Sequence, residues 1–181
     1  MTSEPPTSTS DSAYFSPYRH DGKLYGFICI VTGATLPIGR AIAFELAAHG
    51  AACIYACSPS LDSATGQNSN HTSFHSKSSS DDLAAEINAQ YPNTKVVGYP
   101  LDIANEQDTL ALIDDVLNSC GRLDIWVCAA GWLGPAAIEK TGPMELQRGW
   151  EANCLAPFFA LRWVIPLPMV RICHDGEGKS R

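Results

Sequence analysis

Apolar residues in this chain form two kinds of pattern that alternate along its length. Short continuous apolar runs, bounded by glycine and polar residues, predict buried β-strands near residues 27–32, 52–57, 95–99 and 124–129. Segments in which apolar residues recur every three or four positions predict helices near residues 38–49, 81–90, 106–119 and 143–165. This alternation predicts an α/β fold with a doubly wound parallel sheet. Because crossovers between parallel strands are right-handed, the expected strand order is 3-2-1-4.

Polar residues and glycine at the predicted helix ends support these assignments. Ser80, followed by two aspartates, is the expected N-cap of the second helix. Asn105, with Asp108 three positions later, is the expected N-cap of the third helix, and Gly121 is expected to end that helix.

The stretch between the first strand and the first helix is the most informative part of the chain. Ile38, Ile42 and Leu46 recur every four residues and predict the buried face of that helix. The turn before it contains Gly33, which can adopt backbone angles closed to other residues, and Gly39, which permits close helix–strand packing. Because the first N–H groups of a helix lack partners, the turn predicts a phosphate-binding site. A purely structural strand-to-helix turn is the alternative.

This turn resembles the fingerprint T-G-x-x-x-G-x-G of the short-chain dehydrogenases and reductases. Thr32, Gly33 and Gly39 match it, and Pro37 replaces the middle glycine. Proline suits the first turn of a helix because it needs no N–H partner there, so the fold should tolerate it. The resemblance implies a Rossmann-type sheet and a nicotinamide dinucleotide held by Gly33, Thr35, Pro37, Ile38 and Gly39.

The sequence LDIA at residues 101–104 extends the resemblance, because it matches the acidic end of the third strand in that family. The resemblance implies that the Asp102 side chain binds the adenine amino group of the cofactor. It also implies that the backbone N–H of Ile103 binds an adenine ring nitrogen.

The sequence LDIWVCAAG at residues 123–131 matches the fourth strand and its N-N-A-G ending. Ala130 and Gly131 match and are therefore expected beside the cofactor. Cys128 and Ala129 replace the two asparagines, and the asparagine lost at residue 129 normally braces the neighbouring strand and the cofactor. The resemblance therefore implies looser cofactor binding than is usual in the family.

The segment 150–169 resembles the helix that carries the catalytic asparagine of the family, and Asn153 is that residue. Pro157 lies four positions later and has no backbone N–H, so the Asn153 carbonyl lacks its usual helical partner. In the family this carbonyl oxygen holds a water molecule that passes protons to a lysine. A proline kink in a core helix explains the local pattern nearly as well.

The family's other catalytic residues are a serine after the fifth strand and a Y-x-x-x-K pair on the next helix. The 181 residues end before the position of that strand. Tyr91 and Lys95 have the right spacing, but Pro92 and Asn93 exclude a helix between them. The chain is therefore expected to be an inactive amino-terminal form of an oxidoreductase for an alcohol or ketone. A non-catalytic dinucleotide-binding or interaction module is the alternative.

The end of the second strand bears on which nicotinamide cofactor is bound. NAD-preferring members of the resembled family place an acidic residue there, whereas this chain has Cys57 followed by Ser58. We expect Ser58 to lie beside the cofactor and NADP to be preferred modestly over NAD. A Cys57→Asp change is expected to reverse that preference.

Residues 1–22 are rich in serine, threonine and proline and predict a flexible polar tail. Residues 23–181 are expected to form one incomplete nucleotide-binding domain, truncated after the fourth strand and the following helix, with a polar loop insertion at 58–80. Without a fifth strand the fourth becomes an exposed apolar edge, which favours self-association or a homo-oligomer.

Composition narrows the functional classes further. A net charge of −7 and a pI near 5.1 disfavour nucleic acid as a partner. The expected location is the cytoplasm, because neither a signal peptide nor a membrane-spanning segment is recognisable. No ligand spacing predicts a metal site. Scattered through apolar segments are seven cysteines that we expect to be reduced core thiols: Cys29, Cys53, Cys57, Cys120, Cys128, Cys154 and Cys173.

Overall fold

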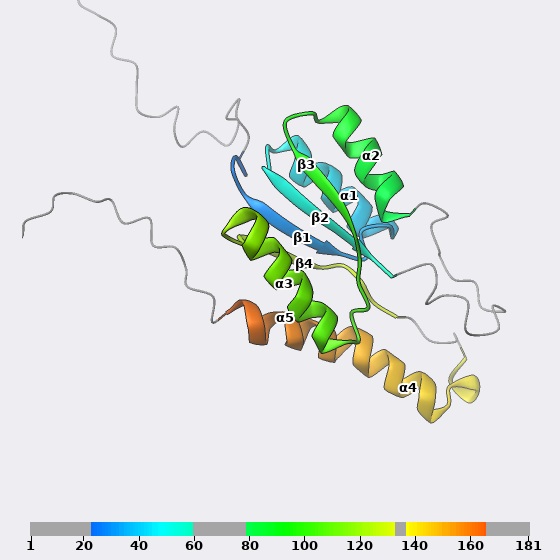
Figure 1. Ribbon diagram of the computed structural model, residues 1–181. Coiled ribbons are helices and arrows are strands. Elements are labelled where there is room, and N and C mark those ends of the chain that lie inside the picture. The colour runs from blue at the N-terminus through cyan, green and yellow to red at the C-terminus, as the bar shows by residue number, and fades with distance from the viewer. Residues whose placement is uncertain (1–22, 60–78, 133–136, 166–181) are drawn as a thin grey trace, which may run out of the picture.

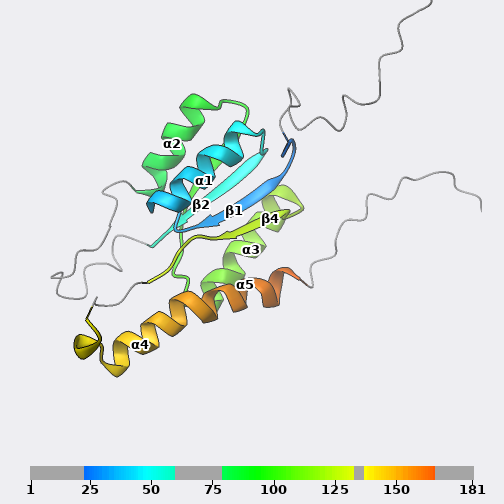
Figure 2. The same cartoon turned by 180° about the vertical axis from the view of Figure 1, so that it is seen from behind.

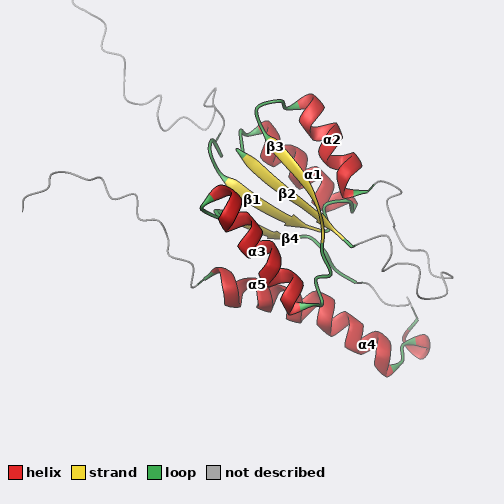
Figure 3. Cartoon of the chain, in the orientation of Figure 1, coloured by secondary structure: helices red, strands yellow, loops and turns green. Residues whose placement is uncertain are grey.

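The structure is a computed structural model that describes residues 23–59, 79–132 and 137–165. Its sheet has four parallel strands in the order β3-β2-β1-β4, as the sequence predicts (Figure 3). The strands are β1 (Ile28–Thr32), β2 (Cys53–Ser58), β3 (Lys95–Pro100) and β4 (Ile125–Cys128).

Helices cover both faces of this sheet. Helices α1 and α2 lie on one face, and α3 and α5 lie on the other (Figures 1 and 2). The helical elements are α1 (Pro37–Ala48), α2 (Ser80–Gln90), α3 (Glu106–Cys120), the 3₁₀ turn η3 (Ile138–Lys140), α4 (Pro143–Trp150), the π-helical segment η4 (Glu151–Leu155) and α5 (Ala156–Val164). This three-layer arrangement confirms the Rossmann-type α/β fold.

Two hydrophobic clusters hold the layers together, one on each face of the sheet. Val31 and Ile54 face α1 and α2, whereas Ile30 and Tyr55 face α3, because neighbouring side chains of a strand point in opposite directions. Leu46 is buried as expected, but the Ile38 side chain is 71% exposed, so the predicted buried face of α1 is wrong at its first residue. Ile38 lies in the first turn of α1, beyond the carboxyl ends of the strands.

The helix ends agree with the sequence except at α2. There the N-cap is Ser79, whose hydroxyl accepts a bond from the Asp82 N–H at 3.1 Å while the Asp82 carboxylate accepts one from the Ser79 N–H. Ser80 is instead the first residue of α2. Asn105 and Gly121 cap α3 as predicted, and the φ of +74° at Gly121 is one that glycine adopts without strain.

The predicted helix 143–165 is interrupted by the π-helical segment Glu151–Leu155. The Ala156 N–H donates to the Glu151 carbonyl, five residues back. Pro157 lies directly after this point and cannot donate to the Asn153 carbonyl. The proline therefore accounts for the change of hydrogen-bond pattern beside Asn153.

Burial of the cysteines only partly follows the prediction of core thiols. Cys29, Cys53 and Cys57 are buried in the strands, but Cys128 and Cys154 are exposed. Cys128 is the last residue of β4, and Cys154 lies within the π-helical segment. Burial raises the pKa of Cys29 and of Cys53 from the ordinary 9.0 to about 12.

These raised thiol pKa values predict a loss of stability at alkaline pH. Above pH 9 the unfolded chain releases thiol protons that the folded chain keeps, so the free energy of unfolding should fall between pH 9 and about 12. Each such thiol contributes a slope of up to about 1.4 kcal/mol per pH unit. Urea unfolding at pH 8, 9 and 10 measures this slope. Cys29→Ala should reduce it and Cys154→Ala should not; equal slopes in all three proteins would contradict the assignment.

Several predicted segments lie outside the described residues, namely the tail 1–22 and most of the insertion 58–80. The two ends of that insertion belong to regular elements, because Ser58 ends β2 and Ser80 begins α2. No helix within the described ranges has the length and apolar character needed to cross a membrane. The described residues also contain no cluster of three or more histidine, cysteine or acidic side chains suited to a metal ion.

Candidate functional site

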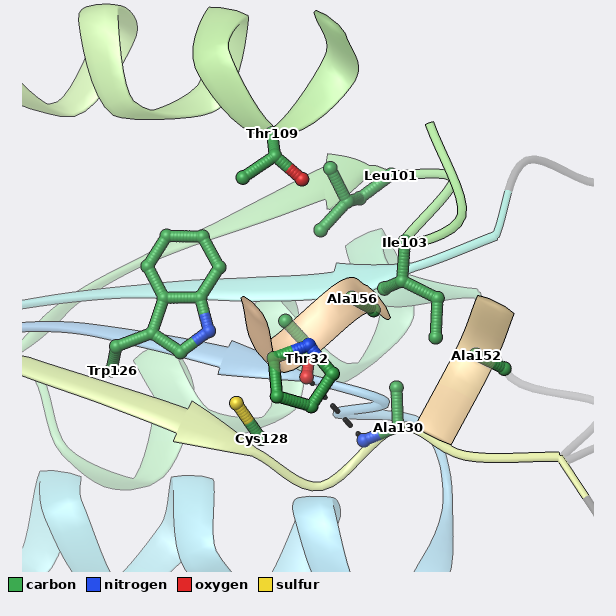
Figure 4. A pocket seen from close by; sticks show the side chains of 10 residues that line it. Thr32, Leu101, Ile103, Thr109, Trp126, Cys128, Ala130, Ala152 and Ala156 are labelled. Carbon is green, nitrogen blue, oxygen red and sulfur yellow. Dashed lines mark hydrogen bonds between the residues drawn. The ribbon is translucent and has the colours of Figure 1, made fainter. Parts of the chain in front are cut away.

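The carboxyl ends of β1 and β4 lie side by side, at the point where the strand order reverses. Ligands of open α/β sheets bind in the crevice that forms at such a point. A small pocket lies there, with a cavity volume of about 10 Å³ (Figure 4). It is lined by Thr32, Leu101, Ile103, Thr109, Trp126, Cys128, Ala130, Ala152, Ala156 and Pro157.

Thr32 ties the two strand ends together at this crevice. Its hydroxyl donates to the Val127 carbonyl at 3.2 Å and accepts a bond from the Ala130 N–H at 3.3 Å (Figure 4). The first bond joins the end of β1 to β4, and the second holds the loop after β4 against the end of β1. Ala130 therefore lies at the crevice and lines the pocket.

Gly33 and Gly39 sit where no side chain fits. Gly33 has φ +66°, and a Cβ there would lie 2.6 Å from the Ala130 Cα. A Cβ on Gly39 would overlap the Gly33 carbonyl oxygen. The two glycines thus let three backbone segments meet, namely the end of β1, the start of α1 and the loop after β4.

The amino-terminal end of α1 faces this junction without a side-chain cap. Leu36 is the N-cap, Pro37 is the first helical residue, and the first turn contains no acidic side chain. The Arg40 N–H donates to the Leu36 carbonyl at 2.8 Å, whereas the Ile38 and Gly39 N–H groups have no partner among the described residues. Two free N–H groups at the positive end of a helix dipole can bind an anion.

Asp102 and Ile103 follow β3 at the same edge of the sheet. The exposed Asp102 carboxylate accepts a bond from the Ala104 N–H at 3.0 Å, and the Asp102 carbonyl accepts one from the Asn105 N–H. These bonds fix the turn that presents Ile103 to the pocket. One Asp102 carboxylate oxygen carries no bond to the described residues and can accept one from a ligand.

Asn153 lies in the π-helical segment η4, and its side chain makes two hydrogen bonds to the backbone of Trp132. Asn153 Oδ1 accepts a bond from the Trp132 N–H and Asn153 Nδ2 donates to the Trp132 carbonyl, both at 2.9 Å. A Cβ on Gly131 would lie 3.0 Å from Asn153 Oδ1, which is closer than an ordinary contact. The side chain of Asn153 is therefore used to position the loop after β4.

Two tryptophan side chains, those of Trp132 and Trp126, also lie near the crevice. The Trp132 ring lies about 3.6 Å from the point where a Cβ on Gly149 would sit, so it packs against α4. Trp126 Nε1 is buried and lacks a hydrogen-bond partner in the described part of the chain. Figure 4 shows this nitrogen turned toward Thr32 and the pocket.

The predicted effect of Cys57→Asp requires the side chain of residue 57 to reach the cofactor, but the end of β2 is buried. Cys57 is 1% exposed and packs in the cluster that faces α3, and Ser58 is buried as well. A carboxylate at residue 57 would lie among apolar side chains, where its ionised form is costly. The substitution is therefore expected to destabilise the fold, and it is not a clean test of cofactor preference.

Tyr91 and Lys95 do not share a helix face, as expected. Tyr91 follows the last residue of α2 and Lys95 is the first residue of β3. The Tyr91 hydroxyl accepts a bond from Gln90, and its ring packs edge-on against Phe44. Neither residue lines the crevice pocket.

Comparison with known proteins agrees with this geometry. The family model described as short chain dehydrogenase matches residues 28–179. The NADPH-dependent aldehyde reductase 1, chloroplastic, of Arabidopsis thaliana is 24% identical over 99% of this chain and 54% of its own length. An NAD-dependent oxidoreductase of Mycobacterium tuberculosis is 33% identical over 80% of this chain and 50% of its own length.

A solved structure has the same fold. The L-sorbose reductase of Gluconobacter frateurii, complexed with NADPH and L-sorbose, superposes with a TM-score of 0.64 and 23% identity. The match covers 81% of this chain and 49% of that protein. The chain thus spans about half the length of the proteins it matches.

Proposed function

Because the chain belongs to the short-chain dehydrogenase family, we propose that it supplies the nucleotide-binding half of an NADP-dependent oxidoreductase. The proposed reaction is hydride exchange between the nicotinamide and a small alcohol or ketone. The observation that carries this proposal is the junction at Gly33 and Gly39, where a Cβ would clash and the N-terminal end of α1 presents free N–H groups.

The residues at this junction fit a dinucleotide. The Ile38 and Gly39 N–H groups would hold the pyrophosphate, with Thr35 and Pro37 beside it in the same turn. Asp102 and Ile103 would hold the adenine, and Ala130 and Gly131 would flank the crevice opposite them. When bound, NADP supplies or accepts the hydride, and these residues bind and orient it.

The preference for NADP over NAD is part of the proposal. No carboxylate is present at the end of β2, where Cys57, Ser58 and Pro59 follow one another, so nothing there repels a 2′-phosphate. The Arabidopsis relative is named NADPH-dependent, whereas the Mycobacterium relative is named NAD-dependent. We therefore propose a modest preference, with Ser58 near the ribose.

Asn153 has two roles in this proposal. Its side chain positions the Trp132 backbone at the mouth of the crevice. Its carbonyl lacks the N–H of residue 157 and would hold a water molecule for proton transfer, as the family resemblance implies. The catalytic contribution of Asn153 would thus come from its backbone.

A non-catalytic dinucleotide-binding or interaction module is the second candidate. The 181 residues place no Y-x-x-x-K pair on a helix. Within the described sheet β4 pairs only with β1, so its outer edge can pair with a strand of another copy. Self-association through β4, with or without catalysis, is therefore part of the proposal.

Calorimetric titration of the chain with NADPH and with NADH tests the proposal. NADPH should bind more tightly, by up to about tenfold, which is about 1.4 kcal/mol. Gly33→Val should bind neither cofactor, because a side chain there would push the loop after β4 away from β1. Gly121→Ala is the matched control, because it also replaces a glycine of positive φ but lies at the end of α3 with nothing within 4 Å. This variant should bind normally. Tighter binding of NADH would overturn the NADP assignment, and a folded chain that binds neither cofactor would overturn the dinucleotide site.

A further inference from the structure

Two cysteines lie close together at the amino-terminal ends of the strands, whereas the crevice lies at the carboxyl ends. Helix α3 follows β3 and returns across the sheet, so its last residue, Cys120, lies near the amino-terminal ends of the strands. Cys53 is the first residue of β2 at that same edge. The topology therefore brings the start of β2 and the end of α3, which are far apart in the sequence, to the same end of the sheet.

Contacts within the cluster under α3 confirm this proximity. Cys53 and Tyr55 lie on the same face of β2, and Cys120 packs against the cluster that contains them both. The Tyr55 hydroxyl lies 4.0 Å from the Cys120 sulfur. Burial and then the electrostatic effect of the neighbouring Cys120 thiol raise the pKa of Cys53.

The two thiols differ in access to solvent, and a third cysteine nearby points the other way. Cys120 is partly exposed at the end of α3, whereas Cys53 is 4% exposed. Cys29 lies in the adjacent strand β1 but belongs to the cluster that faces α1 and α2. Cys57 also faces α3, but it lies near the carboxyl end of β2, whereas Cys53 begins that strand. Cys53 and Cys120 are therefore the pair at the amino-terminal end of β2 on the α3 side.

We propose that Cys53 and Cys120 form an intramolecular disulfide when the chain meets a peroxide. The peroxide oxidises the accessible Cys120 thiol to a sulfenic acid and releases one water molecule. The Cys53 sulfur then attacks the Cys120 sulfur, the S–S bond forms, and the hydroxyl leaves with a proton as a second water molecule. Two thiols are thus oxidised while one hydrogen peroxide is reduced to two water molecules.

The disulfide would link the start of β2 to the end of α3. The closed loop contains α2, β3 and the turn with Asp102 and Ile103. Cross-linking a loop of this length restricts the unfolded chain, so the thermal midpoint should rise by about 5–10 °C. The rise should disappear when dithiothreitol reduces the bond.

Peptide mapping without reduction, after treatment with hydrogen peroxide, tests the proposal. The expected product is one cross-linked peptide pair that contains Cys53 and Cys120. Cys120→Ala and Cys53→Ala should each lose it, and circular dichroism checks that each variant folds. The matched control, Cys128→Ala with Cys154→Ala, removes the two exposed thiols and should keep the cross-link.

Two outcomes would overturn the proposal. One is a cross-link of Cys120 to another cysteine in the wild-type chain. The other is oxidation of Cys120 to the sulfinic acid with no cross-link to Cys53.

Discussion

Gly33→Val is expected to abolish dinucleotide binding and to lower the free energy of unfolding by about 3–5 kcal/mol. Gly33 has φ +66°, which a β-branched residue adopts only with strain, and a Cβ would lie 2.6 Å from the Ala130 Cα. Valine would therefore push the loop after β4 away from β1 and break the Thr32 bonds that join them. Urea unfolding and calorimetric titration with NADPH measure the two effects.

A surface substitution separates binding from folding at the same junction. Ile38→Asp places a negative charge in the first turn of α1, where it interacts favourably with the helix dipole but repels a phosphate. Because the Ile38 side chain is 71% exposed, this variant should fold as well as wild type and yet bind NADPH at least tenfold more weakly. Ile38→Ala is the neutral control and should bind normally. Unchanged affinity in a folded Ile38→Asp chain would place the phosphate elsewhere.

The sheet could be predicted from the sequence because its central strands β1 and β2 are buried on both faces and β3 and β4 are partly buried. Such strands are continuous apolar runs, and right-handed crossovers then leave little choice in their order. The glycine turn could also be predicted, because the backbone contacts at Gly33 and Gly39 leave no room for a side chain. Local rules also located the capping roles of Asn105 and Gly121.

The errors have two sources, a choice between adjacent caps and the packing of neighbouring elements. Ser79 and Ser80 are both good N-caps, and the reciprocal bonds with Asp82 select Ser79. Ile38 continues the four-residue spacing of α1, yet it lies beyond the sheet and has nothing to pack against. The exposure of Cys128 likewise depends on which elements cover the end of β4.

Two features of the site could not be foreseen because they are tertiary contacts. The paired bonds between Asn153 and Trp132 join residues 21 positions apart, and they depend on where the π-helical segment turns the Asn153 side chain. The unpartnered Trp126 nitrogen depends on the helices packed over β4. The family motif identified Asn153 from the sequence but did not predict the hydrogen bonds of its side chain to Trp132.

The 181-residue chain is expected to bind NADPH without oxidising or reducing any alcohol or ketone at a measurable rate. The proposed reaction needs a proton donor beside the hydride acceptor, and a positioned acid or base contributes about 10²–10⁴-fold to such a rate. The described tyrosines Tyr25, Tyr55, Tyr91 and Tyr99 do not line the crevice pocket. The hydroxyls of Tyr55 and Tyr99 bond to α3 residues, and that of Tyr91 bonds to Gln90.

A coupled measurement separates this expectation from simple misfolding. NADPH affinity and NADPH oxidation with a panel of aldehydes and ketones should be measured on the same preparation of the chain. The positive control is a longer protein that adds a serine and a helical Y-x-x-x-K pair after residue 181. Binding without turnover in the chain, and turnover in the longer protein, is the expected pair of results. Asn153→Ala removes the two bonds that hold the Trp132 backbone at the crevice and should therefore disturb the site. If the chain turns over substrate and Asn153→Ala abolishes that turnover, the 181 residues already contain the proton donor.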